Sequence, residues 1–152
     1  MGRTLVAVEA DSPGADDPLY LDSATRMNMS LPELQRFLEA WVAGFEGRSA
    51  FLKPETFGRL FAVSDAKDAE GYAHGVFVER DPEDDSVVLS HAGCNTLWRC
   101  EWRYDSKERC LVILSSNCGT DDSDQAFRRC IELLDAELAI RASRPGNGAD
   151  KK

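Results

Sequence analysis

The chain has 152 residues, enough for one compact domain and too few for two domains with separate cores. With 43% hydrophobic and 30% charged residues and a mean hydropathy of −0.37, its composition is typical of a globular protein. The 27 acidic residues outnumber the 18 basic ones, giving a formal net charge of −9 and an isoelectric point near 4.7. A protein that tracks phosphates needs a basic face, so we expect no nucleic acid among its partners.

We expect a cytoplasmic protein with no membrane contact and no cofactor. The longest apolar run near the N-terminus is residues 5–8, far shorter than a signal-peptide core or a membrane span. The cysteines are odd in number and lack an exported context, which favours reduced thiols: Cys94, Cys100, Cys110, Cys118 and Cys130.

The first 26 residues predict little regular structure. Weak alternation over residues 4–9 predicts a strand, and residues 19–26 predict a second one. Between them, residues 11–18 are rich in Asp, Pro and Gly, which is typical of a turn-rich loop.

A helix is predicted to begin after Ser30. Ser30 can cap the first amides, Pro32 fits the first turn, and Glu33 completes a capping box. Gly47 can end the helix in a left-handed conformation. Large apolar residues recur between these limits at three- and four-residue spacing, and this stripe needs a sheet to cover it: Leu31, Leu34, Phe37, Leu38, Trp41, Val42 and Phe45.

The middle of the chain predicts an antiparallel meander of four or five strands. Polar turns separate four strand-like stretches, namely residues 72–80, 86–91, 96–104 and 110–115, and residues 57–63 are a candidate edge strand before them. The last stretch is almost continuously apolar, which favours a central strand. In the third, Trp98, Trp102 and Tyr104 are expected to face the core, with the Tyr104 hydroxyl exposed, while Arg99, Glu101 and Arg103 are expected to face solvent.

A second helix is predicted from residue 121, where Asp121, Asp122 and Ser123 are suitable caps. Its buried stripe is predicted to be Phe127, Cys130, Ile131, Leu134 and Leu138. The chain is therefore predicted to be one α+β domain over residues 1–143, with both helices packed on the sheet and a disordered tail over residues 144–152.

A histidine–cysteine group is the one candidate for metal or nucleophile chemistry. If Arg80 pairs with Ser86, His91 lies opposite Gly75, and His74 faces the other side of the sheet. If the register slips by one residue, His74 and His91 become neighbours, with Cys94 just beyond them. No second ligand pair follows in the sequence, and a surface histidine beside a buried thiol explains the same residues.

Acidic residues gather around the predicted meander. Between residues 64 and 85, eight acidic residues stand against two basic ones. The four-strand topology predicts two acidic rims, one at each end of the sheet, that would attract a basic partner; acidic turns that only maintain solubility explain the pattern equally well. The candidate partner-binding residues are Asp65, Asp68, Glu70, Glu83, Asp84, Asp85, Asp121, Asp122 and Asp124.

We expect the protein to bind another protein rather than to be an enzyme, because the sequence contains none of the phosphate-binding, nucleophile-elbow or paired-cysteine motifs. A small acidic domain of this kind suits an inhibitor of a basic, nuclease-like toxin, as in bacterial immunity proteins. The alternative is an adaptor, since the element order over residues 30–142 resembles the effector-binding chaperones of bacterial secretion systems. A small enzyme using cysteine and histidine is a third hypothesis, and the oligomeric state is open.

Overall fold

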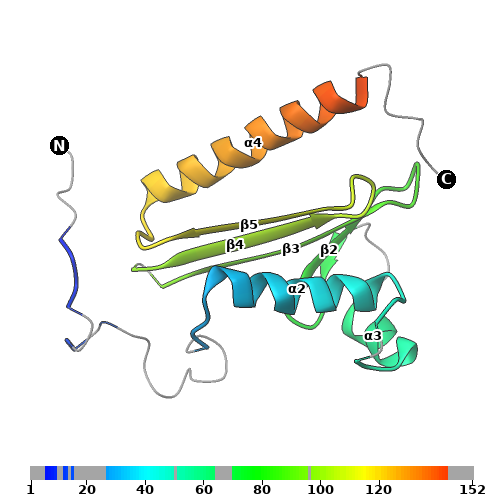
Figure 1. Ribbon diagram of the computed structural model, residues 1–152, viewed down its shortest axis with the longest axis horizontal. Helices are drawn as coiled ribbons and strands as arrows, with labels where there is room; N and C mark the ends of the chain where they lie inside the picture. The colour runs from blue at the N-terminus through cyan, green and yellow to red at the C-terminus, as the bar shows by residue number, and fades with distance from the viewer. Residues whose placement is uncertain are drawn as a thin grey trace.

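The computed structural model describes residues 6–9, 12–13, 15, 27–49, 51–63, 70–95 and 97–143. A five-stranded antiparallel sheet in the order β1-β2-β3-β4-β5 forms the middle layer, with α2 and α3 on one side and α4 on the other (Figure 1). The predicted α+β meander is confirmed. The elements are α2 (Leu31–Phe45), α3 (Pro54–Leu60), β1 (Glu70–Tyr72), β2 (Phe77–Arg80), β3 (Val87–Cys94), β4 (Arg99–Asp105), β5 (Cys110–Ser116) and α4 (Asp121–Ser143).

Helix α2 begins and ends where its local signals predict. The backbone N–H and the hydroxyl of Ser30 donate to the Glu33 carboxylate at 2.8 and 2.7 Å. These hydrogen bonds favour the charged carboxylate and lower the pKa of Glu33. Gly47, two residues past the last helical residue, has a φ of 70°. The first and last residues of α2 are therefore determined by local capping signals in the sequence.

Three predictions for the first half of the chain have different outcomes. Residues 6–9 form no strand, and residues 19–26 lie outside the described part of the chain. The edge strand predicted over residues 57–63 is wrong, because Pro54–Leu60 forms α3. Pro54 occupies the first turn of this helix, where its missing N–H costs nothing, and Phe57 and Phe61 then fall on one helical side.

The strand predicted over residues 72–80 is split by a tight turn. The N–H of Ala73 donates to the carbonyl of Val76 at 2.8 Å, and Gly75 adopts a φ of 84°, which favours glycine. The turn folds β1 back against β2, so that Glu70 lies opposite Glu79. The meander thereby gains a fifth strand, and the chain enters the sheet at the opposite end from the predicted one.

The side of the sheet that faces α2 holds the main core. Tyr104 is only 2% exposed there, so the predicted exposure of its hydroxyl is wrong. Trp102 packs against this core, whereas Trp98 precedes β4 and is 58% exposed, so its predicted core position is wrong. The buried members of the core are Val42, Ala73, Val76, Val78, Val87, Leu89 and Tyr104.

The opposite side of the sheet is covered by α4, partly through ion pairs. Arg99 contacts Asp124 at 2.7 Å, and Arg103 contacts Asp135 at 3.0 Å. The Arg99 guanidinium also lies 5.5 Å from the ring centroid of Phe127, which is buried. The prediction that this side of β4 faces solvent is therefore wrong, because its arginines pair with acidic residues far along the chain.

Strand β5 lies at the edge of the sheet, not at its centre as its apolar sequence predicts. Helices lie on both sides of the sheet (Figure 1), which accounts for apolar residues at successive positions of an edge strand.

On α4, Cys130 is exposed, so its predicted place in the buried stripe is wrong. Residues 144–152, the expected tail, lie outside the described part of the chain. None of the described helices combines the length and apolar character needed to cross a membrane.

Candidate functional site

The histidine–cysteine group does not come together. Arg80 pairs with Val87, which differs from both registers considered, and the β2–β3 ladder begins at Phe77 opposite Ser90. His74 lies in the turn before β2 and is exposed. His91 and Cys94 are three residues apart in β3, so their side chains start on opposite sides of the sheet. Among the described residues, no group of three or more His, Cys, Asp or Glu side chains could hold a metal ion.

One of the two predicted acidic rims differs in the structure. The extra β1–β2 hairpin places Glu70 at the end of the sheet that carries the 81–86 turn, away from Asp121. Asp65 and Asp68 lie outside the described residues. The rim expected to join these residues to the start of α4 is therefore not built as predicted.

Several of the candidate acidic side chains are engaged within the chain. Asp84 contacts Lys107 at 2.7 Å, and this hydrogen-bonded pair lowers the Asp84 pKa well below its usual range. Asp85 lies 3.5 Å from Arg80, and Asp124 contacts two arginines. Within the described ranges, the exposed carboxylates of Glu83, Asp121 and Asp122 have no ion-pair partner.

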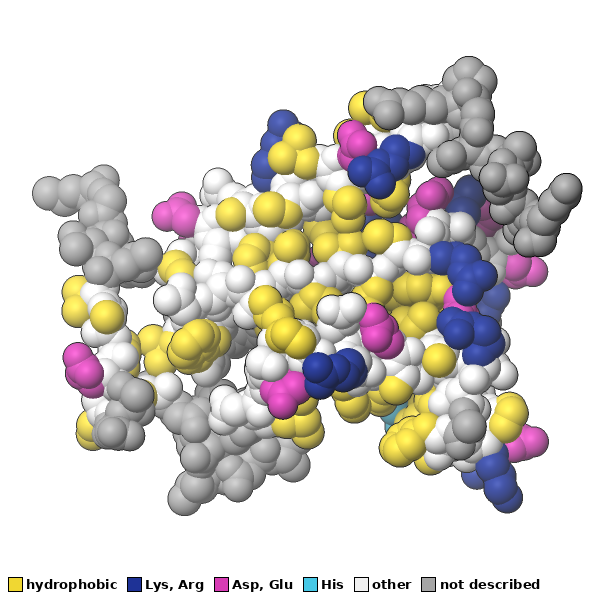
Figure 2. Space-filling model, in the orientation of Figure 1, with side chains coloured by type: hydrophobic (Ala, Val, Ile, Leu, Met, Phe, Trp, Pro, Cys, Tyr) yellow, Lys and Arg dark blue, Asp and Glu magenta, His cyan; other side chains and the backbone are white. Residues whose placement is uncertain are grey.

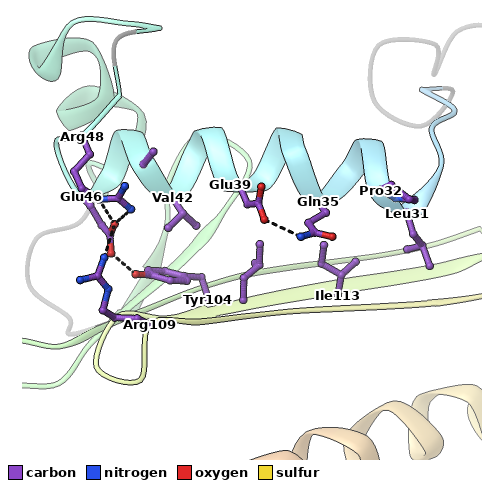
Figure 3. Close-up of a pocket in the computed structure, with 12 residues that line it drawn as sticks. Leu31, Pro32, Gln35, Glu39, Val42, Glu46, Arg48, Tyr104, Arg109 and Ile113 are labelled. Carbon is purple, nitrogen blue, oxygen red and sulfur yellow. Dashed lines mark hydrogen bonds and ion pairs between the residues drawn. The ribbon is translucent and has the colours of Figure 1, made fainter. Parts of the chain in front are cut away.

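A groove of about 790 Å³ runs between α2 and β5 (Figure 3). The sequence analysis missed it, because its walls come from segments about 70 residues apart. Hydrophobic side chains also gather along this side of the molecule, between α2 and α4 (Figure 2). The apolar lining residues are Leu31, Pro32, Val42, Ala43, Leu111 and Ile113, and the polar ones are Gln35, Glu39, Glu46, Arg48, Tyr104 and Arg109.

One end of the groove is closed by a hydrogen-bonded cluster around Glu46 (Figure 3). The Tyr104 hydroxyl donates to one carboxylate oxygen at 2.5 Å, and the Arg48 side chain donates to the other. Arg109 lies 3.7 Å from the same carboxylate, which is only 17% exposed. This cluster ties the end of α2 to β4 and to the turn before β5.

Burial and hydrogen bonding shift both acids of this cluster. Burial, followed by the hydrogen bond to Glu46, raises the pKa of Tyr104 to about 12. The hydrogen bond from Tyr104 is the largest influence on Glu46 and lowers its pKa. At neutral pH the cluster therefore contains a neutral phenol and a charged carboxylate.

The other end of the groove is more open and apolar. Leu31 is 51% exposed at the start of α2, and Gln35 donates to Glu39 at 2.7 Å on the same helix. Ile113 extends from β5 beneath them (Figure 3). Leu111, in the same strand, also lines the groove, and both side chains are half-buried. Their alternation in the sequence was visible, but nothing in the sequence indicated that the strand lies at an edge beside an open groove.

Comparisons of the chain with protein-family models, with curated proteins and with solved structures found no match. The candidate site combines an elongated, partly apolar groove with an edge strand that no described strand covers. These are features that recognise an extended polypeptide.

Proposed function

We propose that the protein is an adaptor-type binding domain that holds a segment of a partner protein in the groove between α2 and β5. One observation carries this proposal: the groove lies directly beside the outer edge of β5, and no described strand pairs with that edge. Natural proteins rarely leave a long apolar edge strand uncovered. A partner segment could hydrogen-bond to the backbone groups at this edge and fill the groove at the same time.

The lining of the groove favours a polypeptide over a small polar ligand. Its charged groups at the closed end already satisfy one another, since Glu46 accepts from Tyr104 and Arg48. The remaining length offers apolar side chains, which gain free energy from any apolar partner at about 25 cal/mol per Å² buried. A segment of a protein can use this whole length.

A second candidate function is inhibition of a basic protein through the acidic surface. The net charge of −9 and the exposed, unpaired Glu83, Asp121 and Asp122 among the described residues support it. Glu83 lies in the turn after β2 and the two aspartates lie at the start of α4, at opposite ends of the sheet. An inhibitory surface would therefore centre on one end and not on a continuous rim.

Capture at two salt concentrations tests the two functions against each other. The tagged chain is incubated with lysate of its native host at roughly 0.1 M and 1 M salt, which shortens the screening length from about 10 Å to about 3 Å. We expect one near-stoichiometric protein that is retained at both, because apolar burial survives screening. The double variant Asp121→Lys and Asp122→Lys is expected to capture the same protein.

The opposite pattern would favour inhibition. A basic partner that is lost at high salt and lost to the double variant would place binding on the acidic end. If neither salt concentration enriches any protein, the protein-binding proposal is wrong.

A further inference from the structure

We infer that the segment held in the groove binds as a sixth strand, added to the outer edge of β5, with apolar side chains at alternate positions and a basic residue toward the start of α4. This inference rests on the proposed function and names the chemistry of the partner. It follows from the alternation of hydrogen bonds along the strands, the position of the groove and the charges along the groove.

The alternation of hydrogen bonds along the strands determines which β5 backbone groups point outward. The N–H of Ser106, just after β4, donates to the carbonyl of Val87 at 3.0 Å, and the N–H of Asn95 donates to that of Trp98 at 3.1 Å. Both pairs continue the β3–β4 register and place the even-numbered β4 residues in hydrogen-bonded pairs with β3. Backbone groups alternate along an antiparallel strand, so the odd-numbered β4 residues bond to β5.

The register then gives the outward set on β5. The odd-numbered residues of β4 pair with Cys110, Val112, Leu114 and Ser116, whose backbone groups therefore point inward. The N–H and C=O groups of Leu111, Ile113 and Ser115 point away from the sheet. Three successive outward residues can hydrogen-bond an added strand along most of the seven-residue β5.

The same residues place their side chains toward the groove. Leu111 and Ile113 pair with Tyr104 and Trp102, on the side of the sheet that faces α2, and both line the groove. Residues directly opposite each other on neighbouring strands point to the same side. The added strand therefore places every second side chain into the groove beside Leu111 and Ile113, and these positions require apolar residues.

The charges along the groove indicate where the segment carries a basic residue. The closed end holds two guanidinium groups, Arg48 and Arg109, around Glu46. Toward the other end lies Glu39, and α4 begins beyond the end of β5 with the exposed Asp121 and Asp122 (Figure 1). A lysine or arginine complements this acidic end, in keeping with the net charge of −9.

A second copy of the chain is a poorer occupant of this edge than a segment. Pairing two β5 strands about a two-fold axis is geometrically allowed. Each copy, however, carries its own α2 against the same side of its β5, so the two helices would compete for the space above the paired strands. A segment free of its own helices pairs with the edge without this competition.

Amide hydrogen exchange, measured for each residue of the chain, tests whether the outer edge of β5 is free to bind a strand. In the free protein we expect the amides of Leu111, Ile113 and Ser115 to exchange quickly, while those of Val112 and Leu114, bonded to β4, exchange slowly. The probe is a peptide selected on the protein from a displayed library of random sequences about ten residues long, longer than a typical strand. Its binding is expected to slow the three outward amides at least about tenfold.

A matched pair of variants tests the backbone contact. Ser115→Pro removes one outward N–H without breaking a bond to β4, a position where edge strands tolerate proline, while Ser115→Ala keeps that N–H. We expect Ser115→Pro to weaken binding of the selected peptide at least about tenfold and Ser115→Ala to leave it unchanged. The selected sequences are expected to alternate apolar residues and to carry lysine or arginine at one end.

Three results would overturn the inference. If the peptide binds but the exchange rates of the three outward amides do not change, the segment does not add to β5 as a strand, while the proposal that the protein binds a partner protein still stands. Outward amides already slow in the free protein would show that the edge is covered, by a second copy if the mass is that of a dimer and by another part of the chain if it is that of a monomer. If no peptide is selected, the proposed function fails as well.

Discussion

Replacing Gly44 by alanine is expected to destabilise the protein by about 2 kcal/mol, although alanine normally stabilises a helix interior over glycine by about 1 kcal/mol. The reason is the close approach of α2 and α3. A methyl group at Gly44 would overlap the ring of Phe57, which is only 4% exposed and cannot move aside into solvent. The substitution therefore forces the two helices apart.

Gly58 provides the control, since it also lies in a helix but has open space around it. Among the described residues, no atom outside its own helical turn and its chain neighbours lies within 4 Å of where the added methyl group would sit. Gly58→Ala is therefore expected to stabilise by roughly 0.5–1 kcal/mol. Urea unfolding of both variants measures the difference in the free energy of unfolding. Equal effects of the two substitutions would contradict the packing of α3 on α2.

Replacing Tyr104 by phenylalanine is expected to cost about 2 kcal/mol, the usual worth of a buried hydrogen bond to a charged group. The hydroxyl donates to Glu46 at 2.5 Å from a side chain that is 2% exposed. Its loss leaves the Glu46 carboxylate with only the two arginines. Tyr72→Phe is the matched control, because Tyr72 is 47% exposed at the far edge of the sheet, and we expect a change below about 0.5 kcal/mol there.

The same pair predicts how stability depends on pH. The pKa of Tyr104 is raised to about 12, above an unfolded value of about 10, so its contribution is complete below pH 10 and is lost as the pH rises toward 12. The pKa of Glu46 is lowered, so its contribution is present above an unfolded value of about 4.3 and is lost as the pH falls through the folded value.

Urea unfolding at roughly pH 9 to 12 tests the alkaline part of this expectation. We expect Tyr104→Phe to lose stability less steeply over this range than the unchanged protein. An identical slope in the two proteins would show that the Tyr104 hydroxyl is neither buried nor bound to Glu46 as described.

The parts of the fold that local signals control could be predicted from the sequence. Helix α2 is defined by the Ser30–Glu33 capping box and ends before Gly47. The strands from β3 to β5 were found because polar turns separate them. The turn at residues 73–76 was missed, since its only signal is Gly75 within an otherwise strand-like stretch, and it changed the direction in which the chain enters the sheet.

The candidate site could not be predicted, because it depends on which elements become neighbours. The apolar sequence of β5 is equally typical of a central strand and of an edge strand covered on both sides. Likewise, nothing local indicates that Tyr104 meets Glu46, 58 residues earlier, or that Arg103 meets Asp135 across two layers. These contacts arise from tertiary packing and define both the groove and the placement of α4.

The most direct test of the central claim blocks the groove without disturbing the core. Gln35 is exposed on α2 and lines the groove, while Ala40 is exposed on the same helix and does not. With the partner captured by the unchanged protein, calorimetry on purified components compares Gln35→Trp with Ala40→Trp. We predict that Gln35→Trp weakens binding at least about tenfold, or 1.4 kcal/mol, and that Ala40→Trp leaves it unchanged. Equal affinities for both variants would show that the partner does not bind between α2 and β5.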